Sequence, residues 1–100
     1  MEKDVPHYRL HEAQQAVALR RADAFTKTAL NNGLMMGLSI QQMVESVCAM
    51  TRQCFYKSMT THASSKIWQD VYHAPTPEGV AYVKVTLRED GAVVIQFKEI

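Results

Sequence analysis

The chain has 100 residues, of which 47% are hydrophobic and 21% are charged, an ordinary composition for one globular domain. This balance excludes the disordered and fibrous classes, and no apolar stretch approaches the length of about 18 residues that a membrane-spanning helix requires. The formal net charge of +1 gives the chain little ability to steer a charged partner over a distance. We therefore expect a single domain over residues 1–100.

The first ten residues, MEKDVPHYRL, are charged and lack the apolar middle of a signal peptide. We therefore expect a cytoplasmic protein. Its two cysteines, Cys48 and Cys54, should then be reduced and at least partly buried. They do not form a CxxC pair, and the four histidines are scattered, so the sequence predicts no zinc site.

Two helices are predicted in the first part of the chain. Residues 8–21 repeat apolar side chains at helical spacing. Residues 26–36 do the same, although Asn32-Gly33 is also a turn signal; we favour a helix that ends at Gly37. The apolar positions are Leu10, Ala13 and Val17 in the first segment and Ala29, Leu30 and Leu34 in the second.

A third helix has the clearest start. Ser39 is a good N-cap residue, and Gln42 stands three positions further on, which is the pattern of a capping box. The apolar residues that follow at helical spacing are Ile40, Met43, Val44, Val47 and Met50. The chain has six methionines, which could indicate copper binding or a promiscuous groove; packing is the better interpretation because most of them lie at core spacing.

The hydrophobic period changes to two near the end of the chain, where GVAYVKVTL and AVVIQFKE read as two strands of a hairpin. A two-residue turn at Asp90-Gly91 would oppose apolar and polar faces, because opposed residues must point to the same side of a sheet. A three-residue loop with Gly91 in the left-handed conformation matches all the apolar pairs. This register places Tyr82 directly opposite Lys98 on the open face.

Helices followed by strands indicate the α+β class, with about three helices packed on one face of an antiparallel sheet. Basic residues outnumber acidic residues by three between positions 51 and 88. This excess is compatible with an anionic partner, and a solvated face is an equally good interpretation. The charged residues are Arg52, Lys57, Lys66, Lys84 and Arg88 against Asp70 and Glu78.

Lys57 occupies an unusual place, directly after Phe55 and Tyr56 in the stretch FYKSMTT. Either its aliphatic stem covers packed aromatic rings while the ammonium stays in water, or a functional site holds a cation in a partly dry place. Partial burial or a second cation nearby would lower the pKa of a lysine and make it useful for proton transfer. We expect a lowered pKa for Lys57.

The motifs FYKSMTT, IWQDVY, AYVKVT and FKE, together with the opening MEKDVPHYRL, resemble the MqsR family, the motility quorum-sensing regulator toxins of bacterial toxin–antitoxin pairs. The resemblance covers nearly the whole chain. It implies a RelE-like α+β fold and an endoribonuclease that cuts mRNA at preferred short sequences without a metal ion or cofactor. It also implies a cognate antitoxin that contains zinc and binds DNA, so that operator DNA is contacted only through the antitoxin complex.

The resemblance assigns catalysis to Lys57, Gln69, Tyr82 and Lys98, and all four residue types are present. One stretch departs from the family, in which the residues after Tyr72 are often basic. Here the stretch reads His73-Ala74-Pro75, which leaves the preferred RNA sequence open. Strand alternation does not explain how Gln69 would reach an open face.

Cleavage of RNA without a metal requires removal of the 2′-hydroxyl proton, charge stabilisation at phosphorus and a proton for the 5′-oxygen. We expect Trp68 and Tyr72 to stack on unpaired bases, and Lys66, Lys84 and His73 to contact the RNA. His62 and His73 are an alternative acid–base pair, or simply exposed loop residues. A binding module of the same fold that grips RNA or a protein and cleaves nothing is the alternative function.

Overall fold

The three predicted helices form in the computed structural model, which describes residues 1–100. They are α1 (Leu10–Arg20), α2 (Lys27–Met35) and α3 (Ile40–Cys48), and two short 3₁₀ turns cover Arg21–Ala24 and Arg52–Cys54. The capping box of α3 is present, because Ser39 and Gln42 each accept a hydrogen bond from the other's backbone N–H. None of the helices is long and apolar enough to span a bilayer.

Helix α2 includes the Asn32-Gly33 pair and ends as the sequence predicts. The Thr26 hydroxyl caps its first turn by accepting a hydrogen bond of 3.0 Å from the Ala29 N–H. At the other end Gly37 has a φ of +95°, and the N–H of Leu38 donates to the Gly33 carbonyl at 3.0 Å. This is a Schellman motif, which needs the left-handed residue that glycine supplies without strain.

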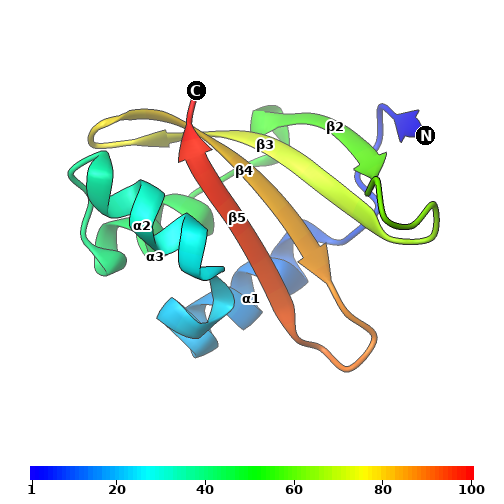
Figure 1. Cartoon of the computed structure of the whole chain (residues 1–100), viewed down its shortest axis with the longest axis horizontal. Coiled ribbons are helices and arrows are strands. Elements are labelled where there is room, and N and C mark those ends of the chain that lie inside the picture. The colour runs from blue at the N-terminus through cyan, green and yellow to red at the C-terminus, as the bar shows by residue number, and fades with distance from the viewer.

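Five strands form one antiparallel sheet in the order β1-β2-β3-β4-β5 (Figure 1). The second half of the chain supplies four of them, and the first residues add the short edge strand β1, which the hydrophobic pattern did not predict. The strands are β1 (Glu2–Lys3), β2 (Phe55–Thr60), β3 (Trp68–Thr76), β4 (Gly79–Leu87) and β5 (Val93–Glu99).

The register of the β4–β5 hairpin confirms the three-residue loop. Leu87 opposes Val93, and Tyr82 opposes Lys98. The Arg88 and Ala92 backbones pair just outside the loop, and Gly91 has a φ of +87°. The alternation of apolar and polar residues therefore decided which loop joins these strands.

The hydrophobic core lies between the helices and one face of β3, β4 and β5. Figure 1 shows the helices gathered on one side of the twisted sheet, with α2 running beside β5. The outer edge of β5 is paired at Ile95 by a backbone bridge from Phe25, which shortens the unpaired strand edge. The fully buried side chains from both layers include Val17, Met43, Val47, Tyr72, Val83, Ile95 and Phe97. The opposite face of the sheet, which we call the open face, is not covered by a helix.

The N-terminal segment is fastened to the core side of the sheet by one buried carboxylate. Asp70 is 1% exposed and accepts hydrogen bonds from the backbone N–H groups of His7 and Tyr8 at 2.9 and 2.8 Å. The Ser58 hydroxyl donates a third at 2.7 Å. Asp70 thereby fixes residues 7–8 to β2 and β3, and its charge is satisfied by these donors in place of water.

Candidate active site

The open face carries a row of three side chains from neighbouring strands. His73 on β3 opposes Tyr82 on β4, and Tyr82 opposes Lys98 on β5. The Lys98 Nζ lies 5.1 Å from the centre of the Tyr82 ring, and the His73 ring centre lies 5.8 Å from it. The predicted meeting of a phenol and an ammonium is therefore present, and an imidazole joins them.

A second row of opposed residues runs parallel to the first, two residues away along β3, β4 and β5. Lys57 on β2 opposes Val71, Val71 opposes Lys84, and Lys84 opposes Gln96 on β5. The Lys84 Nζ lies 6.0 Å from the Tyr82 ring centre, which links the two rows. We call Tyr56, Lys57, His73, Tyr82, Lys84 and Lys98 the open-face cluster.

Tyr56 belongs to this cluster although the sequence did not single it out. Its ring is 54% exposed and stacks on His73 with a centre separation of 4.6 Å and an interplanar angle of 27°. A β-bulge between Phe55 and Lys57 shifts the register, so that neighbouring residues Tyr56 and Lys57 both reach the open face. Strict alternation would have sent them to opposite faces, and no pattern in the sequence signals the bulge.

Lys57 differs electrostatically from the expectation. Its Nζ forms an ion pair of 3.3 Å with the Glu2 carboxylate on β1. This hydrogen-bonded contact raises the pKa of Lys57 above its ordinary value, so the predicted lowering is wrong. Lys57 is consequently a firmly protonated ammonium, suited to binding an anion and unsuited to removing a proton.

Gln69 lies on the open face of the sheet, a position that strand alternation in the sequence did not predict. It shares the parity of Val71 and His73, and its backbone opposes Met59 on β2. The side chain is 8% exposed and lies two residues along β3 from the Lys57–Lys84 row. The structure therefore brings Gln69 to the right face but does not bring it into the open-face cluster.

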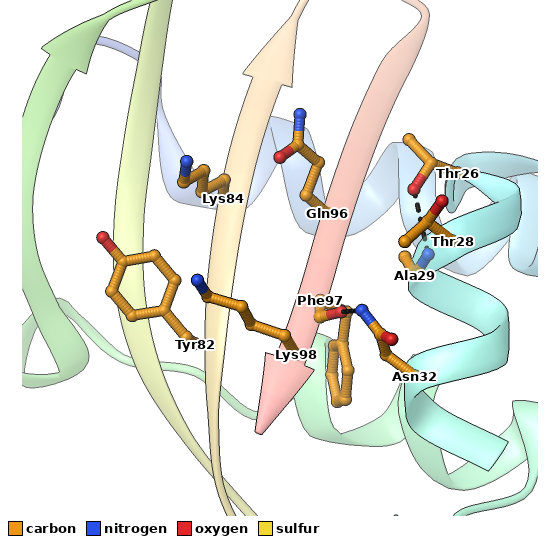
Figure 2. A pocket seen from close by; sticks show the side chains of 9 residues that line it. All are labelled: Thr26, Thr28, Ala29, Asn32, Tyr82, Lys84, Gln96, Phe97 and Lys98. Atoms are coloured by element: carbon orange, nitrogen blue, oxygen red, sulfur yellow. Dashed lines mark hydrogen bonds between the residues drawn. The ribbon is translucent and has the colours of Figure 1, made fainter. Parts of the chain in front are cut away.

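A hollow of about 390 Å³ extends from this cluster to the first turn of α2 (Figure 2). Figure 2 shows Lys84, Tyr82 and Lys98 along one wall, with Gln96 beside them and Thr28 across the gap. Its far wall is positioned by Asn32, whose side-chain amide donates a 3.0 Å hydrogen bond to the Phe97 carbonyl. The hollow thus combines ammonium groups with uncharged hydrogen-bonding groups.

Three residues expected to contact RNA lie away from the open face. Tyr72 is 1% exposed in the hydrophobic core, so the expectation that it stacks on a base is wrong. Burial raises the pKa of its phenol to about 12. Trp68 points to the same side of the sheet as Asp70, the core side. Its ring stacks on His7 with a centre separation of 5.4 Å, and the Lys3 ammonium lies over the ring, where an RNA base would have to stack. Lys66 is exposed in the β2–β3 loop.

The structure places His62 and His73, the alternative acid–base pair, in separate parts of the molecule. His73 lies within the open-face cluster, whereas His62 is exposed in the β2–β3 loop. His7 and His11 stand four residues apart, but His7 precedes α1 and stacks on Trp68. No group of three or more His, Cys, Asp or Glu side chains is arranged to hold a metal ion.

Chemically, the open face offers cations for an anion, a phenol and an imidazole for proton transfer, and exposed aromatic surface. The ammonium groups of Lys84 and Lys98 lie near the Tyr82 ring, and that of Lys57 lies 5.4 Å from the centre of the Tyr56 ring. Glu2 and Glu99 lie at the margins. Such a set fits a phosphodiester, because ammonium groups offset its charge and aromatic rings accept its bases.

Comparison with known proteins agrees with this chemistry. Residues 5–99 match the family described as "Motility quorum-sensing regulator, toxin of MqsA". The chain is 36% identical over 99 residues to the mRNA interferase toxin MqsR of Escherichia coli (strain K12), and the similarity covers 99% of both proteins.

Proposed function

The chain belongs to the family of motility quorum-sensing regulator toxins and is an mRNA-cleaving endoribonuclease, and we propose that it cuts RNA on the open face of its sheet by a metal-independent reaction. Family membership also implies an antitoxin partner and an RNA substrate. The observation that carries the proposed site is the opposed row of His73, Tyr82 and Lys98, flanked by two further lysines.

In this proposal the 2′-hydroxyl of the RNA attacks the neighbouring phosphorus, which produces a 2′,3′-cyclic phosphate and a 5′-hydroxyl end. The Lys98 ammonium offsets the charge that grows on the phosphate oxygens, and Tyr82 supplies a proton to the departing 5′-oxygen. Lys57 holds the substrate phosphate as a fixed cation, consistent with its raised pKa. Ammonium groups at the reacting centre support a metal-independent route, since a divalent cation would be repelled there.

The RNA follows the open face in a single-stranded form. Lys84 and His73 contact its backbone or bases, and Tyr56 replaces the buried Tyr72 as the ring on which a base can stack. The hollow beside α2 receives the nucleotide next to the cut, where Gln96 and Thr28 offer hydrogen bonds to a base edge. We assign Gln69 a supporting place at the far side of the lysine row, where its amide can bind a flanking phosphate.

We further propose that the antitoxin contains zinc and binds DNA, and that the toxin contacts operator DNA only through it. These features come from the family resemblance and not from the surface of this chain. Because its substrate is mRNA and its partner a regulatory protein, we place the action of the toxin in the cytoplasm.

One experiment tests the proposal and its alternative together. Purified protein is incubated with a mixed-sequence RNA in buffer containing EDTA, and the RNA ends are identified chemically. Cleavage that persists in EDTA and leaves 2′,3′-cyclic phosphate ends is the expected result. RNA that stays intact while its mobility in a gel is retarded would instead support a binding module of the same fold.

A further inference from the structure

The proposed reaction begins when a base takes the proton of the 2′-hydroxyl. Lysine and tyrosine side chains, whose reference pKa values are about 10, are almost entirely protonated at neutral pH. The contact with Glu2 raises the pKa of Lys57 further, so this residue is removed as a candidate. The base must therefore be a different kind of side chain.

His73 is the one member of the open-face cluster with an imidazole, a group that ordinarily changes its protonation between about pH 5 and 8. A neutral imidazole at physiological pH can accept a proton, and an imidazolium can return it. The other members are ammonium and phenol groups, from Lys57, Lys84, Lys98, Tyr56 and Tyr82.

The geometry holds the His73 ring between two aromatic neighbours. Tyr56 stacks on it at 4.6 Å from one strand, and Tyr82 lies at 5.8 Å on the other, directly opposed in the sheet. The residue is half-buried, and it lines one hollow with Lys98 and Glu99. Its ring is consequently oriented by packing and yet open to a substrate.

We propose that His73 is the general base of RNA cleavage, an assignment that rests on the proposed function. Its imidazole accepts the 2′-hydroxyl proton, the 2′-oxygen forms a bond to phosphorus, and the bond from phosphorus to the 5′-oxygen breaks. Tyr82 gives its proton to the departing 5′-oxygen, and the imidazolium then returns a proton to the Tyr82 phenolate, directly or through water. Both side chains thereby regain their starting state, and no other reactant is consumed.

His73 is surrounded by side chains of other chemical kinds. No second imidazole lies among the titratable groups around it. These groups are Tyr56 on β2, Tyr82 on β4, Lys98 and Glu99 on β5, and Cys54 in the second hollow that His73 lines. Lys57 and Lys84 lie further along the same face, near Tyr56 and Tyr82.

The first test is a single-turnover measurement of cleavage of a short RNA from pH 5 to 8.5, with the wild type, His73→Gln and the control His62→Gln. We expect the wild-type rate to fall on the acid side, as an imidazole becomes protonated. His73→Gln should be at least about 100-fold slower at pH 7.5 and should lose this acid-side fall. His62→Gln, altered in an exposed loop, should match the wild type.

The second test assigns the direction of proton transfer. A substrate with sulfur in place of the 5′-oxygen has a leaving group that needs no proton. Tyr82→Phe should recover most of its rate on this substrate, whereas His73→Gln should remain slow. His73→Arg keeps a positive charge but cannot accept a proton, so it should be as slow as His73→Gln.

Binding of a 2′-deoxy analogue at the cleavage position separates folding from chemistry, and His73→Gln should bind it within about threefold of the wild type. The assignment is overturned if His73→Gln or His73→Arg cleaves at nearly the wild-type rate, if the acid-side fall persists in His73→Gln, or if the sulfur substrate rescues that variant. A loss of analogue binding that accounts for the whole rate defect would also overturn it. A wild type that cleaves no RNA at all would instead contradict the proposed function.

Discussion

At the scale of single residues, the ion pair between Lys57 and Glu2 decides what Lys57 can do. The carboxylate keeps the lysine protonated, so the contribution to cleavage that we propose for it is a fixed positive charge. We predict that Lys57→Ala slows cleavage by about 10²–10³-fold, the range found when one charge-stabilising group is removed from an active site. The free energy of unfolding should hardly change, because this ion pair remains partly exposed to solvent.

Single-turnover cleavage and urea denaturation measure the two effects in Lys57→Ala. Lys66→Ala is the matched control, because Lys66 lies in the exposed β2–β3 loop outside the open-face cluster. The control should keep the wild-type rate. Equal rates for Lys57→Ala and the wild type would reduce Lys57 to a surface residue.

Tyr72 gives a second prediction at this scale, about stability at alkaline pH. Its pKa is raised to about 12 by burial in the core, whereas a tyrosine in the unfolded chain titrates at about 10. The unfolded state therefore releases the proton first as pH rises, and stability falls between these two values. The loss assigned to Tyr72 is about 3 kcal/mol, from two pH units at 1.36 kcal/mol each.

Tyr72→Phe should remove this part of the alkaline loss, measured by urea denaturation at successive pH values. A smaller alkaline loss should remain from Tyr8, whose pKa is also raised by burial. Tyr56→Phe, which alters an exposed ring, is the matched control. If Tyr72→Phe and the wild type lost stability in parallel, the core position would not govern the titration.

At the scale of secondary-structure elements, the β4–β5 register places two residues of the proposed site beside each other. Tyr82 and Lys98 are opposed, and the ammonium lies 5.1 Å from the ring centre. We predict that Tyr82→Phe and Lys98→Ala each slow cleavage, and that the double variant loses less than the sum of the two effects in free energy. The rates of the four proteins give this coupling directly, and additive losses would show that the residues act separately.

The attachment of the N-terminal segment to β2 and β3 is a second element-scale feature. Asp70→Ala removes a buried acceptor from two backbone N–H groups and the Ser58 hydroxyl. We predict a loss of about 2–4 kcal/mol in the free energy of unfolding, since these donors are left without partners. Urea denaturation measures it, and hydrogen exchange of the His7 and Tyr8 amides should accelerate.

The exposed Asp4 gives a matched control for that experiment, and Asp4→Ala should change the stability by less than about 0.5 kcal/mol. A loss of this small size in Asp70→Ala would mean that water replaces the missing acceptor.

Elements with an unbroken pattern were predictable from the sequence, because local rules decide them. The α3 capping box and the hairpin register that opposes Tyr82 and Lys98 both follow from spacing alone. The site was harder to predict where the pattern breaks. The bulge at β2 brings Tyr56 beside Lys57, and alternation cannot foresee an inserted residue. The contact of Glu2 with Lys57 joins positions far apart in sequence, so no local pattern reports it.

At the scale of the whole molecule, the toxin assignment makes a prediction about cells. A ribonuclease that cuts mRNA depletes the templates of protein synthesis, so expression of this chain should arrest growth. Co-expression of its antitoxin should restore growth, and expression of Lys57→Ala should be tolerated. Growth curves with immunoblots for equal protein levels provide the measurement. Normal growth at high levels of folded wild-type protein would contradict the assignment.

The strand order has a consequence for how the toxin is made. Synthesis proceeds from the N-terminus, and the open face draws its residues from β2, β3, β4 and finally β5. A nascent chain in which β5 has not yet left the ribosome lacks Lys98 and one wall of the hollow beside α2. With the proposed site, activity should therefore begin only after the last strand has paired, when the codons of that strand have already been read. A polypeptide interrupted before β5 should therefore be harmless to its host, and the transcript under translation should be spared by the incomplete enzyme attached to it.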